Sequence, residues 1–227
     1  MTLISRDFFA RPSVQVAPEL LGCVLEHQTP AGLVAVELTE VEAYAGASDP
    51  ASHAYRGKTA RNAVMFGPPG HAYVYFTYGM YFCVNLVCAR NGSASAVLLR
   101  AGRVIEGEEL ARARRTRGST VISFRDLARG PARLCQAMAI NRTQDGADLL
   151  DPAARLRLRL ATDDERPPEP VQVAAGPRVG VSQAADIPWR FWIADDPTVS
   201  VYRRAVPRRK TTQTTVVPPV PDSECPG

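Results

Sequence analysis

The sequence predicts a single mixed α/β domain with much antiparallel sheet. Its 227 residues can bury a sizeable core in one large domain or in two small ones, and 45% hydrophobic and 22% charged residues are ordinary globular values. Short runs rich in β-branched and aromatic residues follow one another through tight turns, which is typical of antiparallel hairpins. The chain has no internal repeat, so one domain of about 200 residues is the simplest architecture.

Local patterns of hydropathy, turn residues and charge predict the individual elements. Hairpin turns are marked at 29–32 and at Asn91-Gly92. Residues 105–117 are acidic first and basic last, which suits a helix dipole, and a proline in the first turn of 130–140 suits a helix start. The expected strands are 20–27, 33–44, 72–77, 81–89, 94–101, 156–160, 176–181 and 190–193, and the expected helices are 5–10, 105–117 and 130–140.

Composition excludes several classes of protein. No apolar run approaches the roughly 20 residues that span a bilayer, and the first residues lack the features of a secretory signal. A cytoplasmic protein without membrane association is expected.

Five cysteines form no CxxC pair and are expected to be reduced, Cys23 and Cys83 as buried thiols. Three scattered histidines give little support to zinc, and no metal or other cofactor is expected. The net charge of +4 permits a polyanionic partner without establishing one.

One predicted strand carries carboxylates where its apolar face ends. On the period of two, the apolar residues of 33–44 share a face that continues as Glu40, Glu42 and Tyr44. One interpretation is a strand that leaves the core with its last carboxylates in water. The other is a carboxylate at the mouth of a pocket, with an aromatic residue two positions on. A bulge would change which glutamate points inward.

The aromatic block at 73–82 has four tyrosines within nine residues, more than a core needs, because each hydroxyl requires a polar partner or water. A tyrosine-rich hairpin with wet edges and a stacking surface for bases both explain it.

Asn85 and Arg100 interrupt otherwise apolar strands. A buried arginine is costly unless it meets an acceptor, and Glu42 is the natural candidate. The alternative is a strand-end arginine that reaches solvent.

The irregular connection 45–71 carries His53, Arg56, Lys58 and Arg61. It is either a solvated basic loop or a set of phosphate contacts. Together these features place a carboxylate, stacking aromatics, a histidine and basic residues between positions 42 and 100.

Several motifs occur in the order that characterises one known family. They are VEAY at 41–44, SHAYRGKTARN at 52–62, MF at 65–66, YVYFTYGMYFCVN at 73–85, VLLRA at 97–101, GPARLCQA at 130–137 and GPRVGV at 176–181. The chain thereby resembles the alkyladenine (3-methyladenine) DNA glycosylase family over roughly residues 5–202. The resemblance implies one domain with a curved, mainly antiparallel β-sheet surrounded by helices. It also implies a monofunctional, metal-free enzyme that flips alkylated purines from duplex DNA and hydrolyses the N-glycosidic bond. The glycosylase domain would span 1–202, and 203–227, basic and then rich in Pro and Thr, is expected to be a disordered tail.

The resemblance also implies roles for single residues. Glu42 matches the general base that activates water, and Arg100 matches the residue that helps to hold that water and the carboxylate. Tyr44, His53 and Tyr75 match the walls of the pocket for the flipped base.

Further positions match residues that select the base or contact DNA. Asn85 matches the residue that obstructs the exocyclic amine of normal guanine. Tyr78 matches the side chain inserted into the minor groove to fill the vacated stack. The other expected DNA-binding residues are Met80, Arg56, Lys58 and Arg61.

Two other functions would use the same features. A non-catalytic binder of damaged or distorted nucleic acid would bind without releasing base, but it needs no buried carboxylate facing a polyanion. A module for small nucleotides would need a P-loop or GxGxxG pattern, which the sequence lacks. The expected partner is therefore double-stranded DNA that contains damaged purines, bound by a monomer that associates with the nucleoid if the source is prokaryotic.

Overall fold

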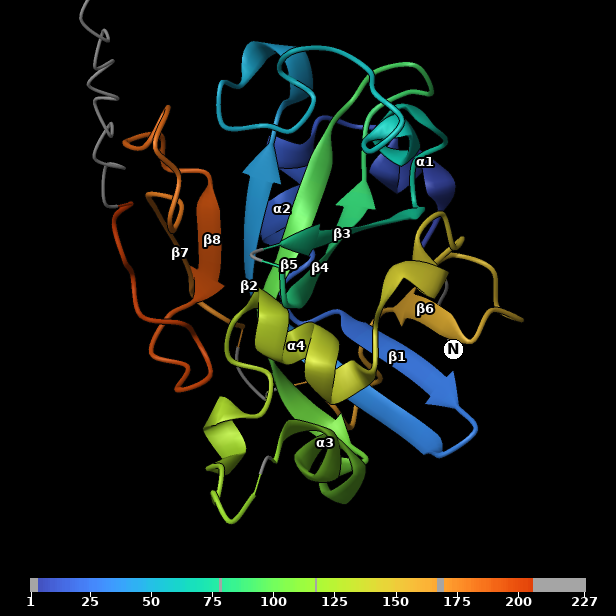
Figure 1. Ribbon diagram of the computed structural model, residues 1–227, viewed down its shortest axis with the longest axis vertical. Coiled ribbons are helices and arrows are strands. Elements are labelled where there is room, and N and C mark those ends of the chain that lie inside the picture. The colour runs from blue at the N-terminus through green and yellow to red at the C-terminus, as the bar shows by residue number, and fades with distance from the viewer. Residues whose placement is uncertain (1–3, 78, 117, 167–169, 206–227) are drawn as a thin grey trace, which may run out of the picture.

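The chain folds around one curled antiparallel sheet (Figure 1). The computed structural model describes residues 4–77, 79–116, 118–166 and 170–205. The strands follow the order β3-β4-β5-β2-β1-β6, while β8 pairs with both β2 and β7. Helices surround this sheet, which confirms the predicted mixed α/β fold with a curved antiparallel sheet. The strands are β1 (Val24–Thr29), β2 (Gly32–Tyr44), β3 (Ala72–Thr77), β4 (Tyr81–Val87), β5 (Ala96–Glu106), β6 (Leu156–Arg159), β7 (Val173–Gly176) and β8 (Arg190–Ile193).

The long strand β2 organises the sheet and carries a bulge. One of its edges pairs with β5, while the other pairs first with β1 and then, over its last residues, with β8. Its register with β5 shifts between Leu38 and Glu40, where Thr39 is an extra residue. A bulge of one residue reverses which side chains face the core. The core contains Leu38 before the bulge but Val41 and Ala43 after it. The prediction that Glu40, Glu42 and Tyr44 continue the apolar face is therefore wrong, because they lie on the opposite face.

The helices pack on both sides of the sheet. In Figure 1, α4 crosses in front of the sheet and α2 lies behind it, and α4 contacts β4 and β5 while α2 contacts β2. As predicted, α4 starts with proline at its first position, where the missing N–H leaves no hydrogen bond unmade. The helices are α1 (Arg6–Phe9), α2 (Ser13–Glu19), α3 (Glu108–Arg115) and α4 (Pro131–Met138), with 3₁₀ turns at Gly46–Ser48, Ala63–Phe66, Phe124–Asp126 and Arg142–Gln144.

Several predicted boundaries need correction. The helix expected at 105–117 begins only at Glu108, because β5 continues through Glu106 and the chain turns at Gly107 with φ of 73°. The strand expected at 20–27 begins at Val24, and the preceding helix α2 was not predicted. The strand expected at 176–181 is not formed there. Strand β7 lies just before it, at Val173–Gly176, and shares only Gly176 with the expected range. The strand boundaries follow from how each strand pairs with its neighbour in the sheet, which local hydropathy cannot show.

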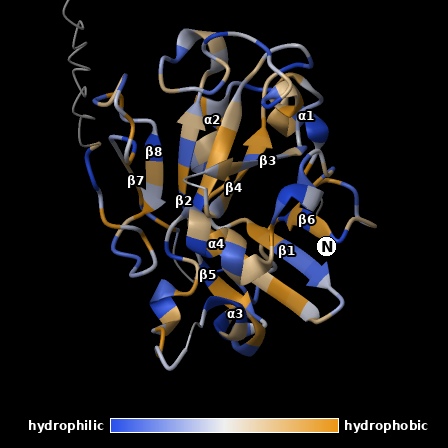
Figure 2. Cartoon of the chain, in the orientation of Figure 1, coloured by the Kyte–Doolittle hydropathy of each residue, from blue (hydrophilic) through white to orange (hydrophobic). Residues whose placement is uncertain are grey.

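Apolar side chains from the strands and helices form the core, and hydrophobic residues concentrate on the central strands (Figure 2). Each cysteine among the described residues, including Cys23 and Cys83, is a buried free thiol, as predicted for those two. Cys225 and most of the expected tail, 206–227, lie outside the described residues. None of the helices in the described ranges has the length and hydropathy of a membrane span.

Candidate active site

The carboxylate of Glu42 is fully buried on β2 but does not lie in the apolar core. Its Oε2 accepts a hydrogen bond of 2.8 Å from the hydroxyl of Tyr44, two residues on along the same face. Its Oε1 accepts a hydrogen bond of 2.7 Å from the backbone N–H of Val179, in the segment that follows β7. Burial and the adjacent charge of Glu42 raise the pKa of Tyr44, so Tyr44 remains a donor at neutral pH.

Arg100 supplies the positive charge beside this carboxylate. The register between β2 and β5 shifts a second time here, because Glu40 pairs with Ala101 and Val41 with Leu99. Arg100 is therefore an extra residue on β5. Its Nη1 lies 3.4 Å from Oε1 of Glu42, so the ion pair expected from the sequence is present. Burial alone would lower the pKa of Arg100, but the charges of Glu42 and Glu40 outweigh that effect and raise it. The guanidinium is therefore charged at any working pH.

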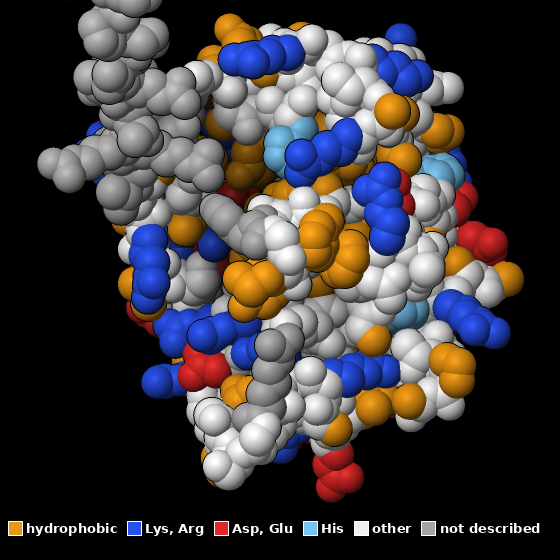
Figure 3. All heavy atoms as spheres, in the orientation of Figure 1, with side chains coloured by type: hydrophobic (Ala, Val, Ile, Leu, Met, Phe, Trp, Pro, Cys, Tyr) orange, Lys and Arg blue, Asp and Glu red, His pale blue; other side chains and the backbone are white. Residues whose placement is uncertain are grey.

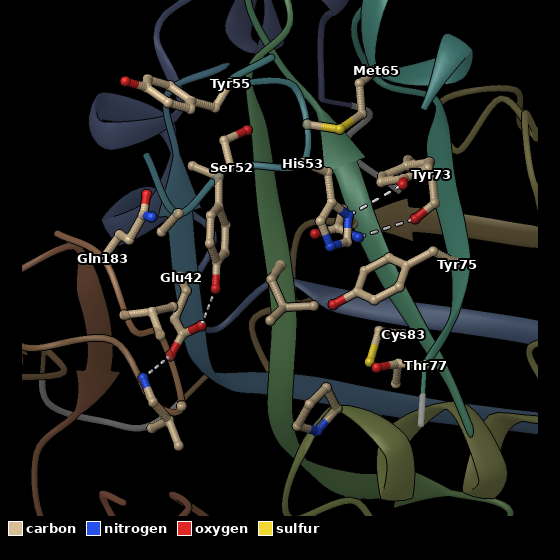
Figure 4. Close-up of a pocket in the computed structure, with 18 of the residues that line it drawn as sticks. Glu42, Ser52, His53, Tyr55, Met65, Tyr73, Tyr75, Thr77, Cys83 and Gln183 are labelled. Carbon is tan, nitrogen blue, oxygen red and sulfur yellow. Dashed lines mark hydrogen bonds between the residues drawn. The ribbon is translucent and has the colours of Figure 1, made fainter. Parts of the chain in front are cut away.

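Aromatic side chains face Glu42 from the other side of the same cavity (Figure 4). His53 packs edge-on against Tyr75 with ring centroids 4.5 Å apart, and Tyr73 and Tyr75 are 5.6 Å apart. His53 Nδ1 lies 3.2 Å from the hydroxyl of Tyr73. Desolvation and the charge of Arg61 lower the pKa of His53, so its ring is neutral at neutral pH. This wall can therefore receive a flat cation without repelling it.

The end of the cavity between these walls is formed by β4 and β5. Asn85 is buried opposite Tyr73, and its Nδ2 donates a hydrogen bond of 3.2 Å to the Tyr73 carbonyl. That bond fixes the orientation of the amide at the cavity surface. The cavity has a volume of about 640 Å³, which is large enough for a purine with part of its sugar. Its lining includes Glu42, Tyr44, Ser52, His53, Arg56, Met65, Tyr73, Tyr75, Cys83, Asn85, Leu98, Arg100, Pro131 and 179–183.

A buried ion pair behind Tyr44 was not predicted from the sequence. Arg178 and Asp49 are both fully buried and form two hydrogen bonds of 2.6 and 2.9 Å. The Arg178 guanidinium lies between two rings, 4.7 Å from the centroid of Tyr44 and 5.2 Å from that of Trp189. The Arg178-Val179 pair thus supports Tyr44 and contacts Glu42. The GPRVGV motif was the available signal, but it served only to predict a strand and to support the family resemblance, and it gave no role to Arg178.

Of the other expected DNA-binding residues, Arg56 lines the cavity, whereas Met80, Lys58 and Arg61 are not among its lining residues. Met80 is 65% exposed at the turn between β3 and β4, whereas Tyr78 lies outside the described residues. Arg61 donates to the Phe76 carbonyl at 3.1 Å, and Lys58 lies over the ring of Phe66. Figure 3 shows this face, where a hollow opens beside a histidine and is bordered by basic and apolar side chains.

The arrangement contains the groups that hydrolysis of a bond to an aromatic base requires. One carboxylate with a fixed arginine partner can activate water or stabilise positive charge, and the rings opposite can hold a planar group. In the part of the chain that the structure describes, no group of three His, Cys, Asp or Glu side chains could hold a metal ion. A buried carboxylate beside an arginine, a cavity with aromatic walls and basic residues nearby are the features expected of the class of nucleic-acid glycosylases.

The comparisons with known proteins agree with this class. The profile of the methylpurine-DNA glycosylase family matches residues 7–197. A protein of Streptomyces avermitilis is 57% identical over 212 residues, covering 93% of this chain and 97% of its own. A protein of Leifsonia xyli subsp. xyli is 52% identical over 204 residues, covering 88% and 92%, and one of Burkholderia cenocepacia is 48% identical over 207 residues, covering 91% and 94%. Each is named “Putative 3-methyladenine DNA glycosylase”.

The chain therefore belongs to the methylpurine-DNA glycosylase family, whose members are DNA glycosylases that act on N-glycosyl bonds. This confirms the resemblance drawn from its motifs.

Proposed function

We propose that the protein, acting as a monomer, flips alkylated purines such as 3-methyladenine from duplex DNA and hydrolyses their N-glycosidic bond. The observation that carries the proposal is the position of Glu42, a buried carboxylate that faces His53 and Tyr75 across one cavity. The glycosidic carbon is inaccessible within a duplex, so the nucleotide must leave the stack before water can attack.

Glu42 is the general base in this proposal. It takes a proton from water while the water oxygen forms a bond to the anomeric carbon, and the carbon–nitrogen bond breaks with its electron pair leaving on the purine. Purines alkylated at N3 or N7 are cationic, so they leave as neutral bases without a general acid. The Glu42 charge also stabilises positive charge that develops on the sugar. Arg100 and the Val179 N–H support this role by fixing the carboxylate from two directions.

One carboxylate is sufficient for this reaction, unlike the pair used by most glycoside hydrolases. The neighbouring Glu40 is unavailable, because its oxygens accept hydrogen bonds from Arg100, Arg190 and Ser200. Among the described residues that line the cavity there is no lysine, which supports hydrolysis without a Schiff base or strand cleavage.

The walls of the cavity favour an electron-poor purine. Stacking of a cationic ring on Tyr44 or Tyr75 contributes about 0.5–2 kcal/mol through the aromatic quadrupole. Neutral His53 closes the same wall, and the fixed amide of Asn85 obstructs the exocyclic amine of guanine.

The rim of the cavity is the proposed DNA-binding surface. Tyr78 would fill the vacated stack, and exposed Met80 would contact the bases beside it. Arg56, Lys58 and Arg61 would contact phosphates, which position the protein without reading sequence.

The test uses duplexes that each carry one defined lesion: 3-methyladenine, hypoxanthine or an etheno adduct. After incubation with the protein, alkali converts any abasic site into a strand break that a denaturing gel resolves. Breaks at 3-methyladenine that appear only after alkali are expected, with an undamaged duplex intact. Retention of the lesion duplex without release of base would instead identify a non-catalytic binder.

A further inference from the structure

A second buried carboxylate, Glu40, lies on the same face of β2 as Glu42, two residues earlier. Its Oε1 accepts hydrogen bonds from Nε of Arg100 at 2.9 Å and Nε of Arg190 at 2.6 Å. Ser200 donates to Glu40 twice, from its backbone N–H at 2.7 Å and from its hydroxyl at 2.9 Å. Glu40 is therefore saturated with donors and contacts the arginine that pairs with Glu42.

Glu40 and Ser200 together determine the orientation of Arg100. The guanidinium is a rigid planar fork whose three nitrogens point in fixed directions. Nε is held by Glu40, and Nη2 donates to the Ser200 hydroxyl at 3.2 Å. With two corners fixed, the third nitrogen, Nη1, can only point where Glu42 lies, 3.4 Å away. Without Glu40 the side chain would be free to rotate about its last bonds.

We propose that Glu40 is a positioning residue for base release, which holds Arg100 against Glu42 and balances its charge. The inference rests on the proposed function of Glu42. Glu40 touches neither substrate nor water in this scheme and acts only through Arg100. A purely structural explanation, in which Glu40 merely neutralises Arg190 and anchors the segment after β8, predicts different results.

The split between rate and binding separates these two explanations. Glu40→Gln replaces the charged acceptor of Arg100 Nε by a neutral amide, so the guanidinium is held less firmly toward Glu42, and base release should slow in a folded protein that still binds the lesion duplex. If Glu40 only neutralises Arg190 and anchors the segment after β8, the variant should lose unfolding free energy, and the folded protein should release base at the parental rate.

Glu37→Gln is the matched control. Glu37 is also a buried carboxylate on β2, paired with an arginine, Arg103 on β5. It contacts neither Arg100 nor Glu42 in any hydrogen bond or ion pair of the described residues. The control therefore removes an equivalent charge from the same strand without touching the site.

The experiment measures single-turnover release of 3-methyladenine and the affinity for the lesion duplex for the parent, E40Q and E37Q, with thermal unfolding to establish folding. E40Q is expected to lower the release rate by about 10- to 100-fold, as misplacing a reacting group does, with duplex affinity unchanged. E37Q is expected to match the parent in both. An E40Q rate equal to that of the parent, or a lower rate with an equal loss of duplex affinity, would overturn the proposal.

A second variant keeps the proposal testable if E40Q does not fold. Ser200→Ala retains every charge and removes one hydrogen bond each to Arg100 and Glu40, so release should slow by about fivefold, while binding to the lesion duplex is unchanged. A parental rate in S200A would then overturn the proposal. Failure of the parent itself to release base would instead refute the proposed function, which keeps the two ideas separable.

Discussion

Replacement of Glu42 by glutamine tests the proposed chemistry most directly, because it preserves volume and removes charge. Glutamine can accept from only one of the two donors, Tyr44 and Val179, that now meet the carboxylate. The other donor would face an NH₂ group, and an unsatisfied buried donor costs about 1–3 kcal/mol of unfolding free energy. The variant should therefore fold with a Tm lowered by several degrees.

The effect on catalysis should be much larger than the effect on folding. Loss of a positioned base lowers rates by about 10²–10⁴-fold, and loss of the anion near the developing sugar cation adds to this. A reduction of at least about 10³-fold is expected, equivalent to ~4 kcal/mol of transition-state stabilisation. Duplex affinity should persist, since phosphate contacts dominate it.

The assay compares single-turnover base release with fluorescence-anisotropy binding to the same duplex for parent and E42Q. The matched control is E37Q, which removes a buried carboxylate from the same strand outside the cavity. Release by E42Q within about tenfold of the parental rate, below the range for a lost general base, would remove Glu42 from its assigned role.

Three further predictions follow from other contacts. Tyr44→Phe removes the 2.8 Å hydrogen bond to Glu42 but keeps the ring, so base release should slow by about 10- to 100-fold with lesion binding retained; equal loss in both measurements would show that the ring was displaced instead. Asp49→Asn leaves Arg178 buried without its countercharge and should reduce unfolding free energy by about 3–5 kcal/mol in denaturant titration; a loss under ~1 kcal/mol would contradict the buried pairing. Burial lowers the pKa of His27 below 6.5, so as the pH falls the unfolded chain binds a proton before the folded protein does. The free energy of unfolding should therefore fall as pH drops below about 6.5. His27→Gln should flatten that dependence, and an unchanged slope would exclude His27 as its source.

The sequence contained the chemical components of the site but not their arrangement. Alternation along β2 marked Glu42 and Tyr44, and the cost of burying an arginine pointed to Arg100 as the partner, which the 3.4 Å ion pair bears out. The bulge at Thr39 was invisible, because a bulge depends on how two strands pair and not on either strand alone. The face assignment was therefore wrong, although the acidic residues were correctly singled out.

Main-chain contacts were equally hard to predict. Val179 meets Glu42 through its backbone N–H, which is present in any residue type except proline. The role of Glu40 was also not predicted, since two of its partners, Arg190 and Ser200, lie 150 residues or more further along the chain. Local periodicity can identify a polar side chain on a strand, but it cannot identify a partner so distant.

The long separation between Glu40 and Ser200 has a consequence for how the protein becomes active. During synthesis the acidic end of β2 emerges early, yet its neutralising partners follow only after most of the chain has been made. Pairings of such high sequence separation form slowly, because the entropy of closing the long loop between them must be overcome first. Under the proposed mechanism, catalytic competence is thus tied to completion of the whole domain. Proteolytic removal of β8 and the residues that follow would leave two carboxylates and one arginine without their final geometry.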